Sequence, residues 1–240
     1  MKYNKEKNID QFNKDLSSHD HYLYHGDKLS SVLSNTRQFE GLTSLYNFEN
    51  KRILDIGSGD GLITLQIAKL KVKSIVGVDP ASKAVSIANE KAKSQNLDHI
   101  TSFINEDIYN HKITDHFDCG VFCRVLHHLS DPQAAISAVA PLVDNILILE
   151  PNGANLILKI LEKTSKYHIE HDEKSYLSST IKKWVINAGF KDLKSIFINL
   201  VPTFCPDFLA KTAKFVEPLI ESLPGIRILA CGQYVLFASK

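Results

Sequence analysis

The sequence predicts a single doubly wound α/β domain, in which a mostly parallel β-sheet is covered by helices on both faces. From Lys51 onward, short β-rich runs alternate with helical patterns, which is typical of strand–helix–strand crossover units. The β-rich runs are continuously apolar rather than alternating, as expected for strands that are buried on both faces. With 240 residues, 44% of them hydrophobic, and without a repeat or a linker, the chain is suited to forming one core.

The first half of this sheet is expected to contain five strands and three helices. The strands are predicted at residues 52–56, 74–79, 100–105, 117–123 and 145–150, and the helices at residues 61–70, 82–95 and 132–142. Ser82 is expected to cap the second helix, and Asp131 the third, whose first turn begins with Pro132. These elements complete the crossover pattern.

The pattern changes after residue 150, where helices at 154–163 and 176–188 precede a strand at 193–200. Gly189 is expected to end the second of these helices. Residues 207–221 have apolar side chains at helical spacing, and residues 234–238 predict a last strand. The first fifty residues are expected to be helical and polar, with a patch rich in histidine and tyrosine that comprises His19, His21, Tyr22, Tyr24 and His25.

Charge and cysteine content limit the partners and the compartment. The formal net charge of +1 provides no broad basic surface, so a small molecule is a better candidate partner than nucleic acid. The first residues lack the apolar core of a signal peptide, and no run approaches the roughly 18–20 apolar residues of a membrane span. The four cysteines are too few and too irregularly spaced for a disulfide framework. We therefore expect a cytoplasmic protein.

The stretch I-L-D-I-G-S-G-D-G at residues 53–61 predicts a cofactor-binding loop. Gly57, Gly59 and Gly61 directly follow an apolar strand, and glycines there let the backbone turn with positive φ and approach a ligand closely. A dinucleotide loop has the spacing G-x-G-x-x-G, whereas this loop has G-x-G-x-G and is preceded by Asp55. A carboxylate at this place repels a pyrophosphate and attracts an ammonium group, which favours a methionine-based methyl donor over NAD.

Four motifs, in this order and spacing, resemble those of the class I S-adenosylmethionine-dependent methyltransferases, in particular the small-molecule enzymes of the methyltransferase-11 or UbiE-like type. They are D-I-G-S-G-D-G at 55–61, V-G-V-D-P at 76–80, N-E-D-I at 105–108 and V-L-H-H-L-S-D-P at 125–132. The resemblance covers about residues 50–150. It implies a Rossmann-like, seven-stranded, mostly parallel sheet with an antiparallel last strand and a helical N-terminal extension. The parts of this single domain (1–240) would be a helical cap at 1–50, a cofactor-binding core at 50–150, and a substrate-side half at 151–240 with insertions at about 152–172 and 202–227.

The resemblance also implies that S-adenosyl-L-methionine is the cofactor. Asp79 would then accept hydrogen bonds from both ribose hydroxyls. Asp107 would accept one from the adenine amino group, with Glu106 as the alternative if the strand register slips by one residue. The cofactor-binding residues expected on this basis are Asp55, Gly57, Ser58, Gly59, Gly61, Asp79, Pro80, Asp107, Ile108, Cys123 and Arg124.

Two histidines are candidates for a catalytic base. His127 follows the fourth strand, where an imidazole whose pKa lies near working pH is well placed to take a proton from a phenol or another hydroxyl. Its neighbour His128 is expected to have a structural role in the loop. His25 either supplies a base, as the N-terminal segment closes over the donor, or lies on a solvated polar helix. His168 and His171, in the first insertion, either contact substrate or belong to a charged surface patch.

A metal site is not expected. Cys119, Cys123, His127 and His128 have a spacing that would bring them together on a helix, but the segment is predicted to be a strand that runs into a loop. Both cysteines would then face the same side of a buried sheet, where small thiols are common.

The acceptor is expected to be a small molecule that is methylated on oxygen or carbon rather than on nitrogen. Methyltransferases that act on amide or nucleic-acid nitrogens carry (N/D)-P-P-(Y/F) after the fourth strand, where this chain has C-R-V-L. The segment 202–227 either forms an apolar lid over a hydrophobic acceptor, rests on a membrane surface to reach a lipid-linked one, or packs against the core. The rival functions are an NAD-dependent oxidoreductase and a non-catalytic S-adenosylmethionine-binding protein.

Overall fold

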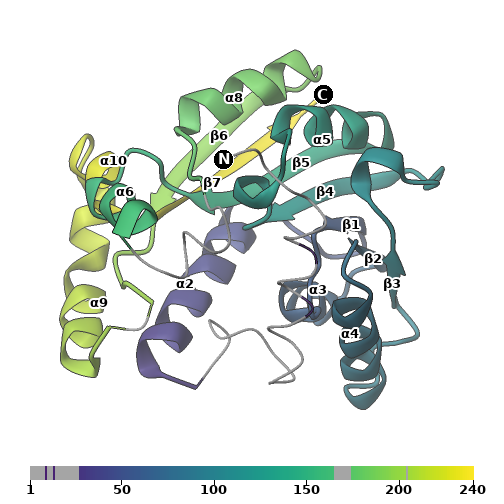
Figure 1. The fold of residues 1–240 in the computed structure, drawn as a ribbon, viewed down its shortest axis with the longest axis horizontal. Coiled ribbons are helices and arrows are strands. Elements are labelled where there is room, and N and C mark those ends of the chain that lie inside the picture. Colours follow the sequence, from purple (N-terminus) through teal and green to yellow (C-terminus); the bar gives the residue numbers. More distant parts are fainter. Residues whose placement is uncertain (1–8, 10–12, 14–26, 165–173, 204) are drawn as a thin grey trace.

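The computed structural model describes residues 9, 13, 27–164, 174–203 and 205–240 of the chain. Its centre is a seven-stranded sheet with the strand order β3-β2-β1-β4-β5-β7-β6 (Figure 1). Strands β1 to β5 pair in parallel, whereas β7 runs antiparallel to both of its neighbours. The predicted fold class is therefore confirmed. The strands are β1 (Arg52–Ile56), β2 (Ser74–Asp79), β3 (Thr101–Asn105), β4 (Phe117–Cys123), β5 (Val143–Pro151), β6 (Lys191–Ile198) and β7 (Gln233–Ser239).

Helices cover both faces of this sheet. The α-helices are α2 (Leu29–Leu45), α3 (Leu62–Ala68), α4 (Ser82–Ser94), α5 (Pro132–Val139), α6 (Leu156–Thr164), α8 (Ser178–Asn187), α9 (Asp207–Ser222) and α10 (Ile226–Ala230). Helices α5 and α8 pack on one face, and α2, α3 and α4 on the other (Figure 1). In the described part of the chain, the loops contain the short 3-10 helices η2 (Ile108–Asn110), η3 (Leu126–His128) and η4 (Ala140–Leu142).

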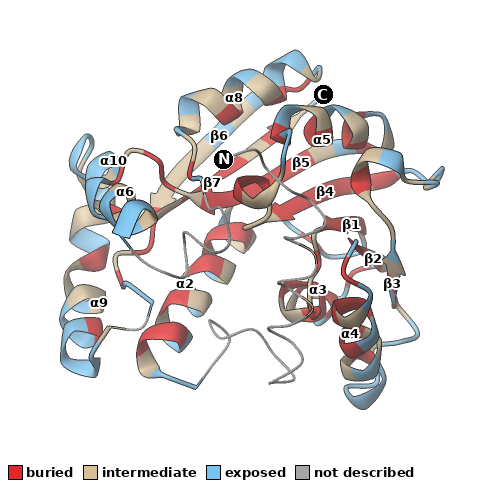
Figure 2. Cartoon of the chain, viewed as in Figure 1, coloured by how far each residue is buried: buried red, intermediate tan, exposed pale blue. Residues whose placement is uncertain are grey.

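The core explains why the strands are continuously apolar. Along β1, Leu54 and Ile56 face the helices α5 and α8, whereas Ile53 faces α2 and α3. All three side chains are buried, because successive residues of a strand point to opposite faces and each face carries helices. Figure 2 shows the buried residues concentrated along the central strands. A strand that alternated polar and apolar residues would have placed polar side chains against the helices on one face of the sheet.

Two of the predicted helix-ending or helix-capping residues are found at the expected positions, and one is not. The Asp131 side chain accepts a hydrogen bond from the Ala134 N–H at 2.9 Å, with Pro132 in the first turn of α5. Gly189 ends α8 with φ +96°. The prediction that Ser82 caps α4 is wrong: Ala81 is the N-cap and Ser82 is the first helical residue. The carboxylate of Asp79 accepts from the Ala81 N–H and holds the chain just before the helix.

The C-terminal half contains a short helix that the sequence pattern did not predict. Helix α10 precedes β7, and two asparagines attach it to the segment that leads into α6. Asn152 Nδ2 donates to the carbonyl oxygens of Ile228 and Cys231, at 2.7 and 2.9 Å, and Asn155 Nδ2 donates to that of Ala230 at 2.9 Å. These bonds satisfy carbonyl groups at the end of α10. They fix α6 and α10 side by side.

Candidate functional site

The glycine loop at the end of β1 has the backbone conformation that the motif predicts. Gly57, Gly59 and Gly61 have φ values of +71°, +54° and +82°. A Cβ atom at Gly57 would lie 2.3 Å from Cγ2 of Val125, so a larger residue does not fit. The N–H groups of Gly57 and Ser58 donate to the carbonyl oxygen of Val78, at 2.8 and 3.2 Å, which ties the loop to the end of β2.

Asp79, the last residue of β2, is joined directly to this loop. Its Oδ2 accepts a hydrogen bond from the Gly59 N–H at 2.9 Å, and its Oδ1 accepts one from the Ala81 N–H at 2.8 Å. Burial raises the pKa of this carboxyl to about 6, although both hydrogen bonds lower it. The two bonds fix the carboxylate at the carboxyl edge of the sheet, where open α/β sheets bind their ligands. Pro80 follows it and is exposed.

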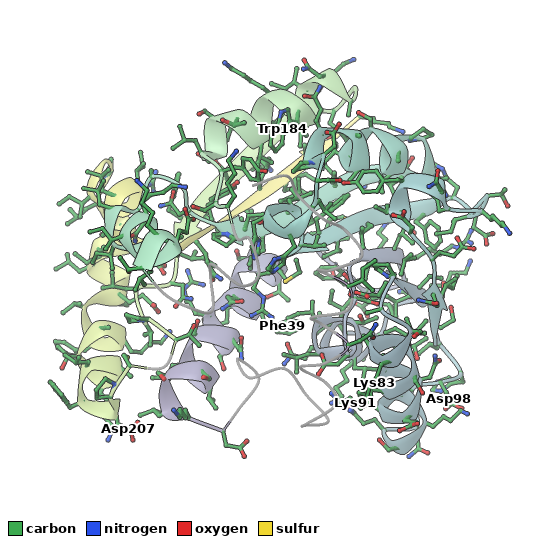
Figure 3. All side chains as sticks on the ribbon, viewed as in Figure 1. Phe39, Lys83, Lys91, Asp98, Trp184 and Asp207 are labelled. Carbon is green, nitrogen blue, oxygen red and sulfur yellow. The ribbon has the colours of Figure 1, made fainter. Side chains whose placement is uncertain are left out.

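Two further acids lie behind the loop. Asp55 is buried on β1, where its Oδ2 accepts a hydrogen bond from the Thr64 hydroxyl at 2.5 Å, and burial raises its pKa to about 7. Asp60 is also buried and forms an ion pair of 2.7 Å with Nζ of Lys91 on α4 (Figure 3). The sequence analysis did not single out Asp60, although its place inside the glycine motif was the available signal. Because Lys91 compensates the charge of Asp60, Asp55 and Asp79 are the acids that make the site attractive to a cation.

The residues after β3 cap a short helix. Asp107 is the N-cap of η2, and its Oδ1 accepts a hydrogen bond from the Tyr109 N–H at 3.2 Å. Ile108 is buried beneath it. The alternative acid, Glu106, accepts a hydrogen bond from the Lys112 N–H at 2.9 Å. The roles of Asp107 and Ile108 toward an adenine ring stay predictions.

The residue that follows β4 contacts helix α2. Arg124 has φ +58°, and its N–H donates to the carbonyl oxygen of Leu149 at 2.8 Å. Its guanidinium donates to Oδ1 of Asn35 on α2 at 3.3 Å. Cys123, the last residue of β4, is half-buried, and burial raises the pKa of its thiol to about 12. Arg124 therefore links the sheet edge to the helix beside it.

His127 is held by a carboxylate that the sequence analysis did not assign. Its Nδ1 lies 2.7 Å from Oε2 of Glu150, at the end of β5, and both side chains are buried. The other oxygen, Oε1, accepts hydrogen bonds from the N–H groups of Val125 and Leu126, each at 2.8 Å. The imidazole of His128 lies against that of His127, with ring centroids 3.9 Å apart. The sequence signals for Glu150 were an acid at the end of a buried strand and its place in the segment E-P-N at 150–152.

Cys119 lies apart from the histidines of this region. Cys119 is packed in the apolar cluster under α2 and α3, whereas His127 is bound to Glu150. Within the ranges that the structure describes, no three potential metal-binding side chains of His, Cys, Asp or Glu gather at one point.

A cavity of about 340 Å³ opens beside these residues, within the range of small-molecule sites. Arg124, His127 and His128 border it from the sheet edge. The C-terminal half of the chain supplies apolar residues from α6 and from the loop after β6, including Leu158, Leu161 and Val201. A polar wall is formed by Gln38, Asn199 and Gln233. The cavity therefore joins an apolar surface to the imidazoles.

Some expected site residues are not at this cavity or lie outside the described residues. Segment 202–227 contributes Pro202 and Thr203 to the cavity wall, but Phe208, Phe215 and Leu219 of α9 are exposed. These three side chains do not line the cavity, and a lid formed by segment 202–227 stays a prediction. His25, His168, His171 and the rest of the N-terminal histidine patch lie outside the described residues.

Comparison with known proteins identifies the class of fold and domain. Residues 53–145 match the model of the methyltransferase domain family. A ubiquinone biosynthesis O-methyltransferase of Glaesserella parasuis is 27% identical over 161 residues, covering 59% of this chain and 65% of the relative. A release factor glutamine methyltransferase of Buchnera aphidicola is 29% identical over 137 residues, covering 53% of this chain and 46% of the relative. The matched region thus spans between 46% and 65% of the length of these relatives.

A solved structure matches over nearly the whole chain. The magnesium protoporphyrin IX methyltransferase of Synechocystis, with bound S-adenosyl-homocysteine, superposes with a TM-score of 0.68 and 17% identity. The match covers 99% of this chain and 100% of the other. The fold is that of class I S-adenosylmethionine-dependent methyltransferases, and residues 53–145, which include the glycine loop, match a methyltransferase domain. S-adenosyl-L-methionine is the cofactor of this class.

The residues present fit this cofactor. The loop turns with positive φ at Gly57, Gly59 and Gly61, and the lack of side chains at these positions lets a ligand approach its backbone closely. Asp79 presents a carboxylate at the sheet edge, and Asp55 adds a second acid at the same end of β1. Acidic groups suit the positively charged sulfonium and ammonium of the methyl donor.

Proposed function

We propose that this protein transfers the methyl group of S-adenosylmethionine to a small-molecule acceptor bound in the cavity beside His127. The observation that carries the proposal is the position of the cavity, which is bordered by Arg124 and His127 at the same sheet edge as the glycine loop. Its size and apolar lining suit a compact, partly hydrophobic acceptor.

Oxygen or carbon is the favoured site of methylation in this proposal. The segment after β4 reads C-R-V-L, without the tetrad of the amide-nitrogen enzymes. Relatives named as ubiquinone biosynthesis O-methyltransferases support oxygen, whereas those named as glutamine methyltransferases support nitrogen. An imidazole at the cavity wall favours oxygen, since a hydroxyl must lose its proton as it is methylated.

S-adenosylmethionine, when bound, supplies an electrophilic methyl group on its sulfonium. The chain's own residues position the reactants and handle the proton. Because a carboxylate only accepts hydrogen bonds, Glu150 places the imidazole proton of His127 on Nδ1. The basic nitrogen is then Nε2, which takes the hydroxyl proton of the acceptor.

The proposed setting of the enzyme is the cytoplasm. All four cysteines are free, at Cys119, Cys123, Cys205 and Cys231, which suits a reducing compartment. The partner is a small molecule rather than nucleic acid, because a formal net charge of +1 leaves no broad basic surface.

Calorimetric titration of the purified chain tests the proposal first. S-adenosylmethionine and S-adenosylhomocysteine should bind with micromolar affinity, and NAD should not. Asp79→Ala should weaken binding by on the order of 100-fold, because it removes the carboxylate that the ribose hydroxyls would bind. Asp98→Ala, which removes an exposed aspartate beyond α4, should change nothing (Figure 3).

A screen for release of S-adenosylhomocysteine follows, beginning with phenols, quinones and lipid-linked compounds. Turnover that His127→Gln reduces while donor binding is retained would support the proposed base. Binding of NAD alone would overturn the proposal. Donor binding without turnover on any acceptor would indicate a non-catalytic binding protein.

A further inference from the structure

An apolar surface lies on α6, α9 and α10, which adjoin at one end of the sheet (Figure 1). Among the residues that the structure describes, all exposed large hydrophobic side chains except Val32, Leu177 and Ile186 belong to these three helices. We call them the α6–α9–α10 surface. Its members are Leu156, Ile157, Ile160, Leu161, Phe208, Leu209, Phe215, Leu219, Ile226, Ile228 and Leu229.

The exposure of these side chains is unusual for a protein in water. Phe215 is 86% exposed, Ile157 70% and Phe208 68%. Helix α9 buries only Ala210 and Glu217, and neither α6 nor α10 has a buried residue. Scattered exposed hydrophobic residues are ordinary, but a concentration of them on adjoining helices marks an interaction site.

The charges around this surface are arranged asymmetrically. Glu217 is buried, where it accepts from Lys214 Nζ at 2.6 Å and from the Leu200 N–H at 2.9 Å. Glu221 forms an ion pair of 2.5 Å with Arg37 on α2. Glu217 and Glu221, the acids of α9 that follow its first turn, are thus paired with cations on the side of the helix that faces the rest of the protein.

The exposed charges of the same helices are mainly positive. Lys163 on α6 and Lys211 on α9 are exposed, and Arg227 of α10 is half-buried. Asp207, the exposed acid, is the first residue of α9 and lies one turn before Lys211 (Figure 3). Apolar side chains flanked by cations are complementary to the surface of an anionic phospholipid bilayer.

We propose that the α6–α9–α10 surface docks this protein on a bilayer that contains anionic phospholipid. Phe208, Phe215 and the apolar residues of α6 enter the boundary between headgroups and acyl chains, while Lys163 and Lys211 contact the headgroups. In the part of the chain that the structure describes, no helix is long and apolar enough to cross a membrane, so the contact is peripheral.

Docking on this surface places the cavity against the lipid. Ile157 and Leu161 belong both to the surface and to the cavity wall, and Ala230 of α10 lines the cavity as well. An acceptor with an apolar tail therefore reaches the imidazole of His127 while its tail stays among the acyl chains. This consequence rests on the proposed function, whereas the docking itself does not.

Flotation of the full chain with vesicles tests the docking. The protein should float with vesicles of phosphatidylcholine and phosphatidylglycerol, and less with phosphatidylcholine alone. Phe215→Ser should reduce binding by about tenfold, because it removes one large apolar side chain from the interface. Ile186→Ser makes a similar change on α8, where Ile186 is 54% exposed, and should leave binding unchanged. Lys211→Glu should weaken binding to the anionic vesicles alone.

Three results would overturn the docking proposal: no flotation with either vesicle, equal loss in the Phe215 and Ile186 variants, or a dimer that Phe215→Ser dissociates. The last, measured by light scattering, would mean that a second copy covers the surface. Calorimetric binding of S-adenosylmethionine, measured on the same samples, reports on the cofactor site independently. Failure of the docking and failure of the proposed function are therefore distinguishable.

Discussion

Glu150 and His127 form a buried pair in which Oε2 of the carboxylate lies 2.7 Å from Nδ1 of the imidazole. The same carboxylate binds the N–H groups of Val125 and Leu126 through Oε1. The end of β5 therefore fixes both the backbone after β4 and the orientation of the histidine at the cavity wall. Such a carboxylate sets which nitrogen carries the proton.

Replacement of Glu150 by glutamine should change both the tautomer of His127 and the stability of the fold. In the native protein, nitrogen NMR should show the proton of His127 on Nδ1. In Glu150→Gln the amide has lost one of the two strong acceptor oxygens, so the tautomer should become mixed and the free energy of unfolding should fall by about 1–3 kcal/mol. Urea denaturation measures the second effect.

A matched control is Glu106→Gln. Glu106 also accepts a hydrogen bond from a backbone N–H, that of Lys112, but it is only half-buried. The control should leave the His127 tautomer and the stability unchanged. If Glu150→Gln behaves like the control, the carboxylate does not position the imidazole.

The stability of the cofactor-free protein should decrease as the pH rises. Burial raises the pKa of Asp55 to about 7 and that of Asp79 to about 6, and Asp60 adds to the second shift. Both carboxyls are protonated in the folded and unfolded chain at low pH, and the folded chain must ionise them as the pH passes through these pKa values. Their contribution to stability is thus present below the unfolded pKa and lost as the pH rises through the folded pKa.

Asp55→Asn tests this linkage. The free energy of unfolding of the native chain should fall between about pH 5 and about pH 8. In the Asp55→Asn variant this fall should be smaller by roughly 2–4 kcal/mol, because the buried charge is absent. The amide oxygen still accepts from the Thr64 hydroxyl, so the fold is retained. Asp98→Asn, an exposed control, should keep the native pH dependence. Parallel pH curves for the native chain and Asp55→Asn would contradict the assignment.

Two glycines with positive φ should differ sharply in their tolerance of alanine. At Gly57 (φ +71°) a Cβ would lie 2.3 Å from Cγ2 of Val125, whereas at Gly189 (φ +96°) nothing lies within 4 Å. Gly189→Ala should cost only the backbone strain, about 1–2 kcal/mol. Gly57→Ala should cost about 1–3 kcal/mol more through overpacking, and it should abolish donor binding. Thermal unfolding measures the loss of stability, and calorimetry measures donor binding. If the two variants lose the same stability, backbone strain alone and not overpacking against Val125 limits the residue at Gly57.

The sequence predicted the central strands of the sheet because they are buried on both faces. Burial of β1 on both faces requires a continuous apolar run, and the turn after it requires glycine at positive φ. The pair of His127 and Glu150 was not predictable in this way, since these residues are far apart in sequence and meet only because β4 and β5 are neighbours. Local pattern does not specify which side chains meet across a sheet edge.

Helix α9 shows a second limit. Its periodicity indicated an amphipathic helix, which the structure has, but not which face is turned inward. The buried side includes Glu217, because Lys214 and the Leu200 N–H satisfy its carboxylate there, while Phe215 is exposed. Hydrophobic spacing alone predicts the reverse arrangement.

The four thiols should also differ in reactivity. Cys119 and Cys231 are buried, and Cys123 at the end of β4 is half-buried. Burial raises the pKa of Cys119 far above its usual range and that of Cys123 and Cys231 to about 12, so little of the reactive thiolate forms. Cys205 lies half-buried in the loop before α9.

In the folded protein, a disulfide reagent that reports on thiolates should therefore modify Cys205 rapidly and the other three thiols only on unfolding. Cys205→Ser should remove the rapid phase, whereas Cys123→Ser should leave it intact. Added zinc should not change the reaction rate of any of these thiols. Cys119 and His127 cannot bind zinc together, because Cys119 faces an apolar cluster and His127 is bound to Glu150. Rapid reaction of Cys123, or its protection by zinc, would show that the end of β4 opens to solvent and that the imidazole leaves its carboxylate.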